Sequence, residues 1–183
     1  NPTVRKITFT GSTEVGAKLM AQCAPGIKKV SLELGGNAPF LVFDDADLDE
    51  AVKGAMQSKY RNAGQTCVAP DYVLVPRERV EDFVGAYREA VQRLYPSLAD
   101  NPDYTSIINA RQLARLQDYL DDARTKDAHV VPLFAEAQQR RMPHCLLLNT
   151  TDDMRVMQEE IFGPLLPVVP YADLDEALAY INA

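Results

Sequence analysis

Cys67 is the residue of this 183-residue chain whose surroundings most favour covalent chemistry. The five residues before it, NAGQT (62–66), are small or polar and form no apolar stripe that would bury a cysteine in a core. Nucleophiles of α/β enzymes commonly lie in loops at the ends of strands or helices. The alternative is a small buried side chain, the usual state of a free cysteine, which we expect for Cys23 and Cys145.

A cysteine nucleophile needs a neighbouring group that takes up a proton, and Glu33 is the candidate. It interrupts the strand-like segment KVSLEL (29–34) and is followed closely by two glycines, Gly35 and Gly36. A glutamate in a strand commonly faces solvent, but a double glycine lets a ligand approach the backbone closely. A cysteine hydrolase is the alternative, and it requires a histidine beside Cys67.

Two further segments have the composition of ligand-binding turns. GSTEVG (11–16) follows a strand-like segment and opens a helix, where backbone N–H groups can bind phosphate, although a serine-capped helix start has the same pattern. QEEIFGP (158–164) places two carboxylates before an aromatic residue and a Gly-Pro turn, which is also compatible with a plain helix exit.

Segments of strand and helix character alternate along the chain and predict an α/β fold with a mostly parallel sheet. The expected strands are 4–10, a buried one, then 29–34, 40–43, 72–75, 130–133, 145–148 and 165–169. The expected helices are 12–23, 47–60, 78–94, 107–123 and 174–181. The helix over 47–60 has an apolar stripe at helical spacing that includes Lys59.

Composition excludes several classes of protein. A net charge of −7 and a pI near 4.8 argue against a nucleic-acid partner. No apolar run approaches the roughly 18 residues that span a membrane. Three widely spaced cysteines without a C-x-x-C pair predict neither a disulfide framework nor a metal site, so a cytoplasmic setting is expected.

Four segments together resemble the aldehyde dehydrogenase superfamily, in the order and near the spacing of its signatures. They are FTGSTEVG (9–16), LELGGNAP (32–39), NAGQTC (62–67) and EEIFGP (159–164). The resemblance implies that residues 1–35 form the end of a Rossmann-type NAD(P)-binding domain. Residues 36–183 then form an aldehyde dehydrogenase-like catalytic domain that is truncated at its C-terminus.

The resemblance also implies roles for single residues. Cys67 matches the nucleophile that forms a thiohemiacetal and then a thioester, and its backbone N–H matches one oxyanion donor. Glu33 matches the general base that activates the hydrolytic water. The cofactor is NAD or NADP, and the residues expected to bind it are Gly11, Ser12, Gly35, Glu160 and Phe162.

The family pattern also indicates parts that this sequence does not contain. An asparagine of the oxyanion hole and the residues that hold the adenine ribose lie upstream of the first signature. A C-terminal segment completes the substrate funnel and the oligomer contacts of full-length relatives, which are expected to be homo-oligomers. The isolated chain is therefore expected to be inactive.

The substrate clue is Arg61, six residues before Cys67. Residues 28–68 resemble succinate-semialdehyde dehydrogenases, in which an arginine at this place binds the distal carboxylate of the substrate through a bidentate fork. From Ala69 onward the chain resembles coniferyl-aldehyde dehydrogenases instead. Succinate semialdehyde is the lead substrate, and an aromatic or aliphatic aldehyde, or a non-catalytic member of the fold, is the alternative.

Overall fold

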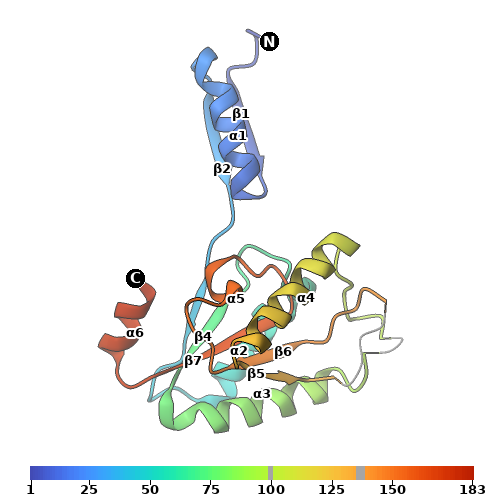
Figure 1. Cartoon of the computed structure of the whole chain (residues 1–183), viewed down its shortest axis with the longest axis vertical. Helices are drawn as coiled ribbons and strands as arrows, with labels where there is room; N and C mark the ends of the chain where they lie inside the picture. The colour runs from blue at the N-terminus through green and yellow to red at the C-terminus, as the bar shows by residue number, and fades with distance from the viewer. Residues whose placement is uncertain (99–100, 135–138) are drawn as a thin grey trace. The chain divides into compact units, whose positions relative to one another are not determined.

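The computed structural model describes residues 1–98, 101–134 and 139–183. It divides the chain into two compact units, residues 1–36 and residues 37–183 (Figure 1). The sequence placed a domain boundary between residues 35 and 36. That the first segment is the end of a cofactor domain stays a prediction.

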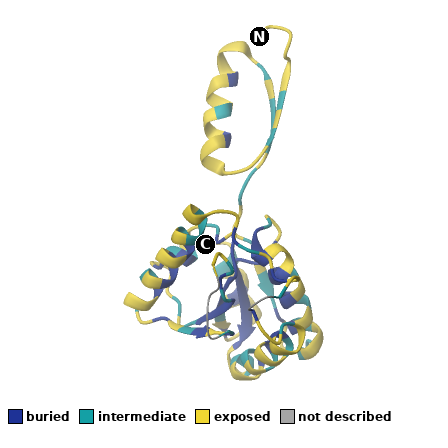
Figure 2. Ribbon diagram, turned by 90° about the vertical axis from the view of Figure 1, so that its right-hand side faces the viewer, coloured by how far each residue is buried: buried dark blue, intermediate teal, exposed yellow. Residues whose placement is uncertain are grey.

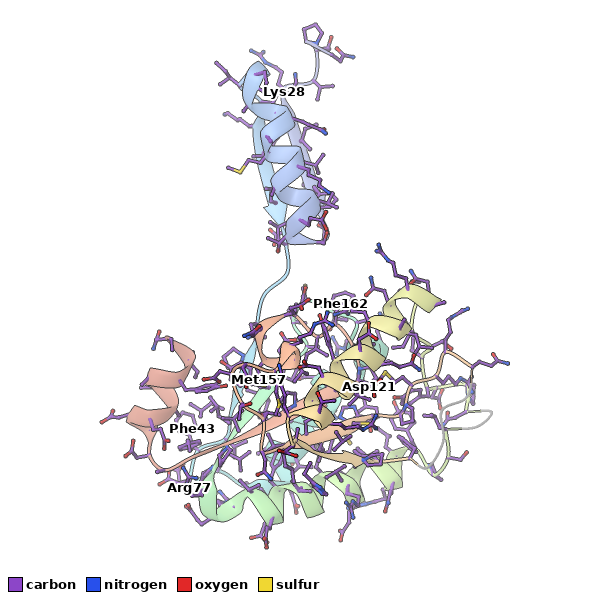
Figure 3. All side chains as sticks on the ribbon, in the orientation of Figure 1. Lys28, Phe43, Arg77, Asp121, Met157 and Phe162 are labelled. Carbon is purple, nitrogen blue, oxygen red and sulfur yellow. The ribbon has the colours of Figure 1, made fainter. Side chains whose placement is uncertain are left out.

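The first unit is a single β-α-β motif. Its elements are β1 (Lys6–Thr10), α1 (Thr13–Cys23), a 3-10 turn η1 (Ala24–Gly26) and β2 (Lys29–Glu33). The two strands are parallel, so α1 serves as the crossover between them. Directly before β2, the Lys28 ammonium group donates to the Asn1 carbonyl at 3.0 Å (Figure 3).

The prediction of a buried strand over 4–10 was wrong. In β1 only Ile7 and Phe9 are half-buried, and the other three residues of the strand are exposed. One helix covers only one face of a two-stranded sheet, so the other face stays in solvent. The alternation of polar and apolar residues in KITFT already indicates such a half-covered strand.

The second unit contains a five-stranded sheet in the order β3-β4-β7-β6-β5. All neighbouring strands are parallel except β5, which runs antiparallel to β6. This confirms the predicted α/β fold with a mostly parallel sheet. The strands are β3 (Pro39–Leu41), β4 (Tyr72–Pro76), β5 (His129–Pro132), β6 (Cys145–Leu148) and β7 (Leu165–Tyr171).

Helices cover both faces of this sheet because alternate strand residues point to opposite sides. Val73, Leu146 and Val168 pack with α2 (Leu48–Tyr60) and α3 (Val80–Leu94). On the other face, Leu147 and Leu165 pack with α4 (Ala110–Thr125) and α5 (Arg155–Gln158), and Leu74 packs with α6 (Leu174–Ile181). The sheet is accordingly the most deeply buried part of the unit (Figure 2).

Two helices begin two or three residues later than predicted. Residues 77–79 form a 3-10 turn, η3 (Arg77–Arg79), so α3 begins at Val80. α4 begins at Ala110 instead of Ile107, because the Asn109 side chain accepts the Gln112 N–H at 2.9 Å and caps the helix there. No helix among the described residues combines the length and the apolar character needed to cross a membrane.

Candidate active site

In the first unit, three of the predicted site residues meet at the carboxyl end of the two strands. Thr10 pairs with Glu33, and the Gly11 N–H donates to the Glu33 carbonyl at 3.0 Å. Ser12 follows in extended backbone, and its hydroxyl accepts the Val15 N–H at 3.4 Å, which starts α1. Ligands of parallel α/β folds bind at this edge, beside helix N-termini.

A side chain at Gly11, in the turn between β1 and α1, would require the Phe9 ring to move. A Cβ built on it would fall 2.5 Å from the Phe9 ring. Without a side chain at this position, the turn leaves the backbone open at the start of α1. The Glu33 side chain is exposed at the end of β2, and Gly35 lies half-buried two residues further.

In the second unit, Cys67 differs from the other cysteines in its exposure. Cys67 is exposed, whereas Cys23 and Cys145 are buried, as expected from their apolar contexts. Burial raises the pKa of the Cys145 thiol to about 12, so Cys145 stays protonated at neutral pH. The exposed position of Cys67 is the one suited to react with a dissolved molecule.

The chain reaches Cys67 through a strained turn that follows α2. Within the 3-10 turn η2 (Arg61–Gly64), Asn62 and Ala63 have φ values of 54° and 53°, and Gly64 has a φ of 74°. Non-glycine residues in this left-handed region each cost about 1–2 kcal/mol, so neighbouring contacts must hold the turn. Backbone strain of this kind clusters at functional sites.

Gln65 supplies much of that support. Its side-chain amide donates to the carbonyl of Asn62 at 3.0 Å and to that of Ser106 at 3.2 Å, and its oxygen accepts the Ile108 N–H at 2.9 Å. The Asn62 amide donates in turn to the Gln65 carbonyl at 3.1 Å. These bonds fix the segment before Cys67 to the residues that precede α4.

The EEIFGP segment lies directly against this turn. A Cβ on Gly64 would fall 2.2 Å from the Gly163 carbonyl oxygen, so the two backbones touch. Gly163 is packed against the Leu116 side chain of α4. The structure therefore brings the NAGQTC and EEIFGP segments together, although they are far apart in the sequence.

Both glutamates of that segment are tied to neighbouring side chains, Glu159 through its carboxylate and Glu160 through its backbone. Glu159 accepts a hydrogen bond from the Tyr119 hydroxyl at 2.8 Å and another from the Arg155 guanidinium at 3.2 Å. The bond from Tyr119 is the main reason that the pKa of Glu159 lies below its ordinary value. Glu159 is thus engaged by the protein. At Glu160 the backbone is held, because its carbonyl accepts from Arg115 at 3.1 Å.

Phe162 occupies the turn between α5 and β7, beside α4 (Figure 3). Its φ of 46° is left-handed, and 39% of its surface is exposed. A strained, exposed aromatic residue between the buried Ile161 and Gly163 is unusual for a packing role, and it leaves a ring surface open to a ligand.

Asp71 and Lys59 are buried charged residues that the sequence did not single out as site residues. The Asp71 carboxylate accepts the Ala38 N–H at 3.0 Å and the Ile161 N–H at 2.8 Å, and the Lys59 ammonium group donates to the Pro70 carbonyl at 2.8 Å. Burial lowers the pKa of Lys59 to about 8. In the sequence, both residues could have been found as charges at expected core positions. Lys59 lies within an apolar helix stripe, and Asp71 lies directly before a strand.

Neither histidine is placed to activate Cys67. His144 is fully buried, stacks on Tyr60 at 4.5 Å between ring centroids, and shares a hydrogen bond of 3.2 Å with the Tyr87 hydroxyl. Burial holds the pKa of His144 well below its ordinary range. His129 is the exposed first residue of β5. The arrangement therefore gives no support to a cysteine hydrolase.

The predicted site residues thus fall into two sets. Gly11, Ser12, Glu33 and Gly35 belong to the first unit. Cys67, Glu160, Phe162 and Arg61 belong to the second, where Arg61 is exposed at the junction of α2 and η2. Within each unit the local segments meet as described.

Comparison with known proteins identifies the family. The family model described as "Aldehyde dehydrogenase family" matches residues 1–183. A probable coniferyl aldehyde dehydrogenase of Pseudomonas aeruginosa is 60% identical over 176 residues, covering 96% of this chain and 37% of the relative. The succinate-semialdehyde dehydrogenase [NADP(+)] of Escherichia coli is 43% identical over 187 residues, covering 100% of this chain and 39% of the relative.

A solved structure agrees with this result. The succinate-semialdehyde dehydrogenase of Burkholderia pseudomallei superimposes with a TM-score of 0.91 at 41% identity, covering 100% of this chain and 39% of that one. The chain therefore spans well under half of the length of the relatives that it matches. Both predicted subgroups, the succinate-semialdehyde and the coniferyl-aldehyde dehydrogenases, are represented, so the predicted resemblance is confirmed.

Proposed function

Because the chain belongs to the aldehyde dehydrogenase family, we propose that its protein oxidises an aldehyde to a carboxylic acid with NAD or NADP, using Cys67 as nucleophile. The observation that carries this proposal is the exposed Cys67 at the end of a strained and tightly hydrogen-bonded turn. The turn abuts the EEIFGP segment, so the backbone before Cys67 is packed against the segment that contains Glu160 and Phe162.

The first step is addition of the Cys67 sulfur to the aldehyde carbon. The C–S bond forms as the carbonyl π pair moves to oxygen, and the Cys67 backbone N–H is one donor for that oxyanion. Preorganised donors of this kind stabilise charge that develops in the transition state. The strained, anchored turn keeps the Cys67 N–H in place, because the Gln65 bonds prevent it from relaxing.

The second half of the reaction releases the acid. NAD or NADP, which Gly11, Ser12, Glu160 and Phe162 would hold, would supply the hydride acceptor for the oxidation that leaves the substrate as a thioester on Cys67. Glu33 then takes a proton from water, whose oxygen attacks the thioester carbon. The C–S bond breaks, Cys67 leaves as thiolate, and the carboxylic acid dissociates.

The chain has the residues to bind such a cofactor. The open backbone at Gly11 and Ser12 lies at the start of α1, where backbone N–H groups favour a phosphate. Gly35 allows close approach after β2. In the second unit, Glu160 is the carboxylate proposed to accept the ribose hydroxyls, and the exposed Phe162 ring packs against the same end of the cofactor.

We propose a substrate with a distal carboxylate, with succinate semialdehyde as the lead. Arg61 supports this choice because it is an exposed guanidinium six residues before Cys67, at the helix end that opens the nucleophile turn. Its planar fork can bind a carboxylate bidentately. The E. coli and Burkholderia relatives carry this substrate in their names.

An aromatic aldehyde of the coniferyl type is the second candidate. The relative that is 60% identical is named a probable coniferyl aldehyde dehydrogenase, and its match includes both sides of residue 68. An aromatic substrate has no carboxylate at the distal end of a short chain, so it would leave Arg61 without a role in binding.

The test uses residues 1–183 set into the matching stretch of the P. aeruginosa relative, here called the flanked enzyme. The activity of this enzyme is measured on a panel of aldehydes with NAD and with NADP. In the Arg61→Leu variant, KM for succinate semialdehyde should rise about tenfold or more, while KM for coniferyl-type aldehydes stays within about twofold. The exposed Arg77, which lies beyond β4, provides the control Arg77→Leu.

Each other outcome excludes a candidate. Preference for coniferyl-type aldehydes with no effect of Arg61→Leu would replace the lead substrate by the second candidate. Absence of turnover with every aldehyde and both cofactors would overturn the enzymatic proposal and favour a non-catalytic member of the family.

A further inference from the structure

The backbone on either side of Ile161 is held from opposite directions by two charged side chains. Its N–H donates to the buried Asp71 carboxylate at 2.8 Å. Its carbonyl accepts from the Arg115 guanidinium at 2.7 Å, and the same guanidinium donates to the Glu160 carbonyl at 3.1 Å. Three charge-assisted hydrogen bonds therefore fix two consecutive residues of a turn that has no regular secondary structure.

Asp71 connects this turn to the nucleophile segment. It lies four residues after Cys67, directly before β4. Its second oxygen accepts the Ala38 N–H at 3.0 Å, and its own N–H donates to the Ala38 carbonyl at 2.8 Å. One buried carboxylate thus links the residues after Cys67, the segment before β3 and the EEIFGP turn.

Arg115 connects the same turn to α4. It donates to the Gln112 side chain at 2.7 Å and to the Tyr119 hydroxyl at 2.9 Å, and it lies 5.0 Å above the Tyr119 ring. Arg155 approaches that ring at the same distance, so Tyr119 contacts two guanidinium groups. A side chain held by this many partners has little freedom, and its donors stay aimed at the Glu160 and Ile161 carbonyls.

We propose that Asp71 and Arg115 are positioning residues that set the affinity for the nicotinamide cofactor by fixing the Glu160–Ile161 backbone relative to the Cys67 segment. This inference rests on the proposed function, in which Glu160 accepts the ribose hydroxyls. Neither residue contacts the cofactor in this account. They act through the placement of Glu160.

Amide hydrogen exchange on residues 1–183 alone, without cofactor, tests whether Asp71 and Arg115 fix the backbone at Ile161. Asp71→Asn places an amide N–H₂ where an acceptor is needed, and Arg115→Lys cannot serve both carbonyls. Each should speed exchange of the Ile161 amide about tenfold or more, since a bond to a charged partner is lost. The exposed residues Asp118 and Arg111 of α4 give the matched controls Asp118→Asn and Arg111→Lys, which should leave exchange unchanged.

Cofactor titration of the flanked enzyme tests whether this placement of the backbone sets the affinity for the nicotinamide cofactor. Both variants should weaken binding of the reduced cofactor, followed by its fluorescence, about tenfold, and should raise KM for NAD(P) with KM for aldehyde within about twofold. The double variant should cost less than the sum of the single effects, because both side chains hold the same backbone.

Two results would overturn the inference: unchanged Ile161 exchange, or faster exchange with cofactor affinity within twofold of the parent. The second would mean that the pair serves stability alone. Arg115→Lys, which keeps its charge at a half-buried site, provides the answer if Asp71→Asn does not fold. Failure of the proposed function is distinguishable, because the unsubstituted flanked enzyme would then show no turnover with any aldehyde of the panel.

Discussion

The two units hold their site residues by different physical means. In residues 1–36 only Gly16 and Cys23 are buried, and the fold is one helix on a two-stranded sheet. In residues 37–183 a five-stranded sheet is packed on both faces, with charged side chains enclosed beside it (Figure 2). The first unit positions its proposed site residues at the ends of its strands and at the start of its helix. The second unit positions them through hydrogen bonds from buried side chains.

This difference matches the precision that each proposed step needs. A phosphate bound by the start of a helix tolerates small shifts, because several N–H groups and the helix dipole act together. A nucleophile and its oxyanion donor must be fixed to fractions of an ångström. The unit that contains Cys67 also contains the strained turn and the buried side chains that support it or lie beside it, namely Gln65, Asp71 and Lys59.

The largest effect should come from the covalent centre of the second unit. In the flanked enzyme, Cys67→Ala should lower turnover by at least about a thousandfold, because no other group can form the thioester. Cofactor binding, measured by fluorescence, should stay unchanged. Cys23→Ala is the control with a buried thiol. Appreciable turnover by Cys67→Ala would contradict the assignment of the nucleophile.

The second largest effect should come from Glu33, the proposed general base in the first unit. Glu33→Gln should slow turnover about a hundredfold or more, since the amide cannot take up the proton of the hydrolytic water. The first turnover should remain fast and appear as a burst of reduced cofactor. The exposed Glu14 of α1 provides the control Glu14→Gln. Equal slowing of burst and steady state would mean that Glu33 does not act in hydrolysis alone.

Two glycine substitutions compare the units directly. Gly64→Ala puts a Cβ 2.2 Å from a backbone oxygen at a φ of 74°, so it should lower the free energy of unfolding by about 3 kcal/mol. Gly11→Ala meets only the Phe9 ring, which can swing away, and should cost about 1 kcal/mol or less. Urea unfolding followed by circular dichroism suits a chain without tryptophan. Similar losses for both would remove the contrast between the units.

A smaller effect concerns pH and the buried amine of Lys59. Burial lowers its pKa from 10.5 to about 8, so between these values the unfolded chain binds more protons than the folded one. The contribution of Lys59 to the free energy of unfolding should therefore rise with pH, by about 2 kcal/mol from pH 8 to pH 9.5. Burial raises the pKa of Cys145, Tyr60 and Tyr87, and these groups contribute in the opposite direction as the pH rises, so the contribution of Lys59 has to be separated from theirs.

Lys59→Met isolates that contribution. The free energy of unfolding of the parent minus that of the variant should rise by about 2 kcal/mol between pH 8 and pH 9.5, measured by urea unfolding at pH 7, 8 and 9.5. Lys53→Met is the control, since Lys53 lies on the same helix and is exposed. A Lys59→Met chain with the same pH dependence as the parent would contradict the assignment to Lys59.

Local sequence patterns predicted most elements of this fold. The apolar stripe of α2, the pair β6 and α6, and the exposed Cys67 agree with their predicted places. The prediction that the strand over 4–10 is buried was wrong, although the alternation of polar and apolar residues in KITFT (6–10) already indicates a strand with one covered face. The late start of α4 depends on a single capping bond of Asn109.

The positioning residues could not be predicted for a related reason. Asp71 and Arg115 matter through partners 90 and 46 positions away, at Ile161. A charge beside an apolar segment indicates that some partner exists, but not which one. The signatures around Cys67, Glu33 and Glu160 were recognisable because each is contiguous in the sequence. The contacts that join the signatures are not.

Trapping the acyl-enzyme tests the central claim most directly. The flanked enzyme with Glu33→Gln is mixed with succinate semialdehyde and NAD(P), quenched in acid, digested and analysed by mass spectrometry. One acyl group, released by hydroxylamine, should be found on the peptide that contains Cys67. An unmodified Cys67 peptide after the cofactor has been reduced, or acylation of Cys23 or Cys145 in its place, would contradict it.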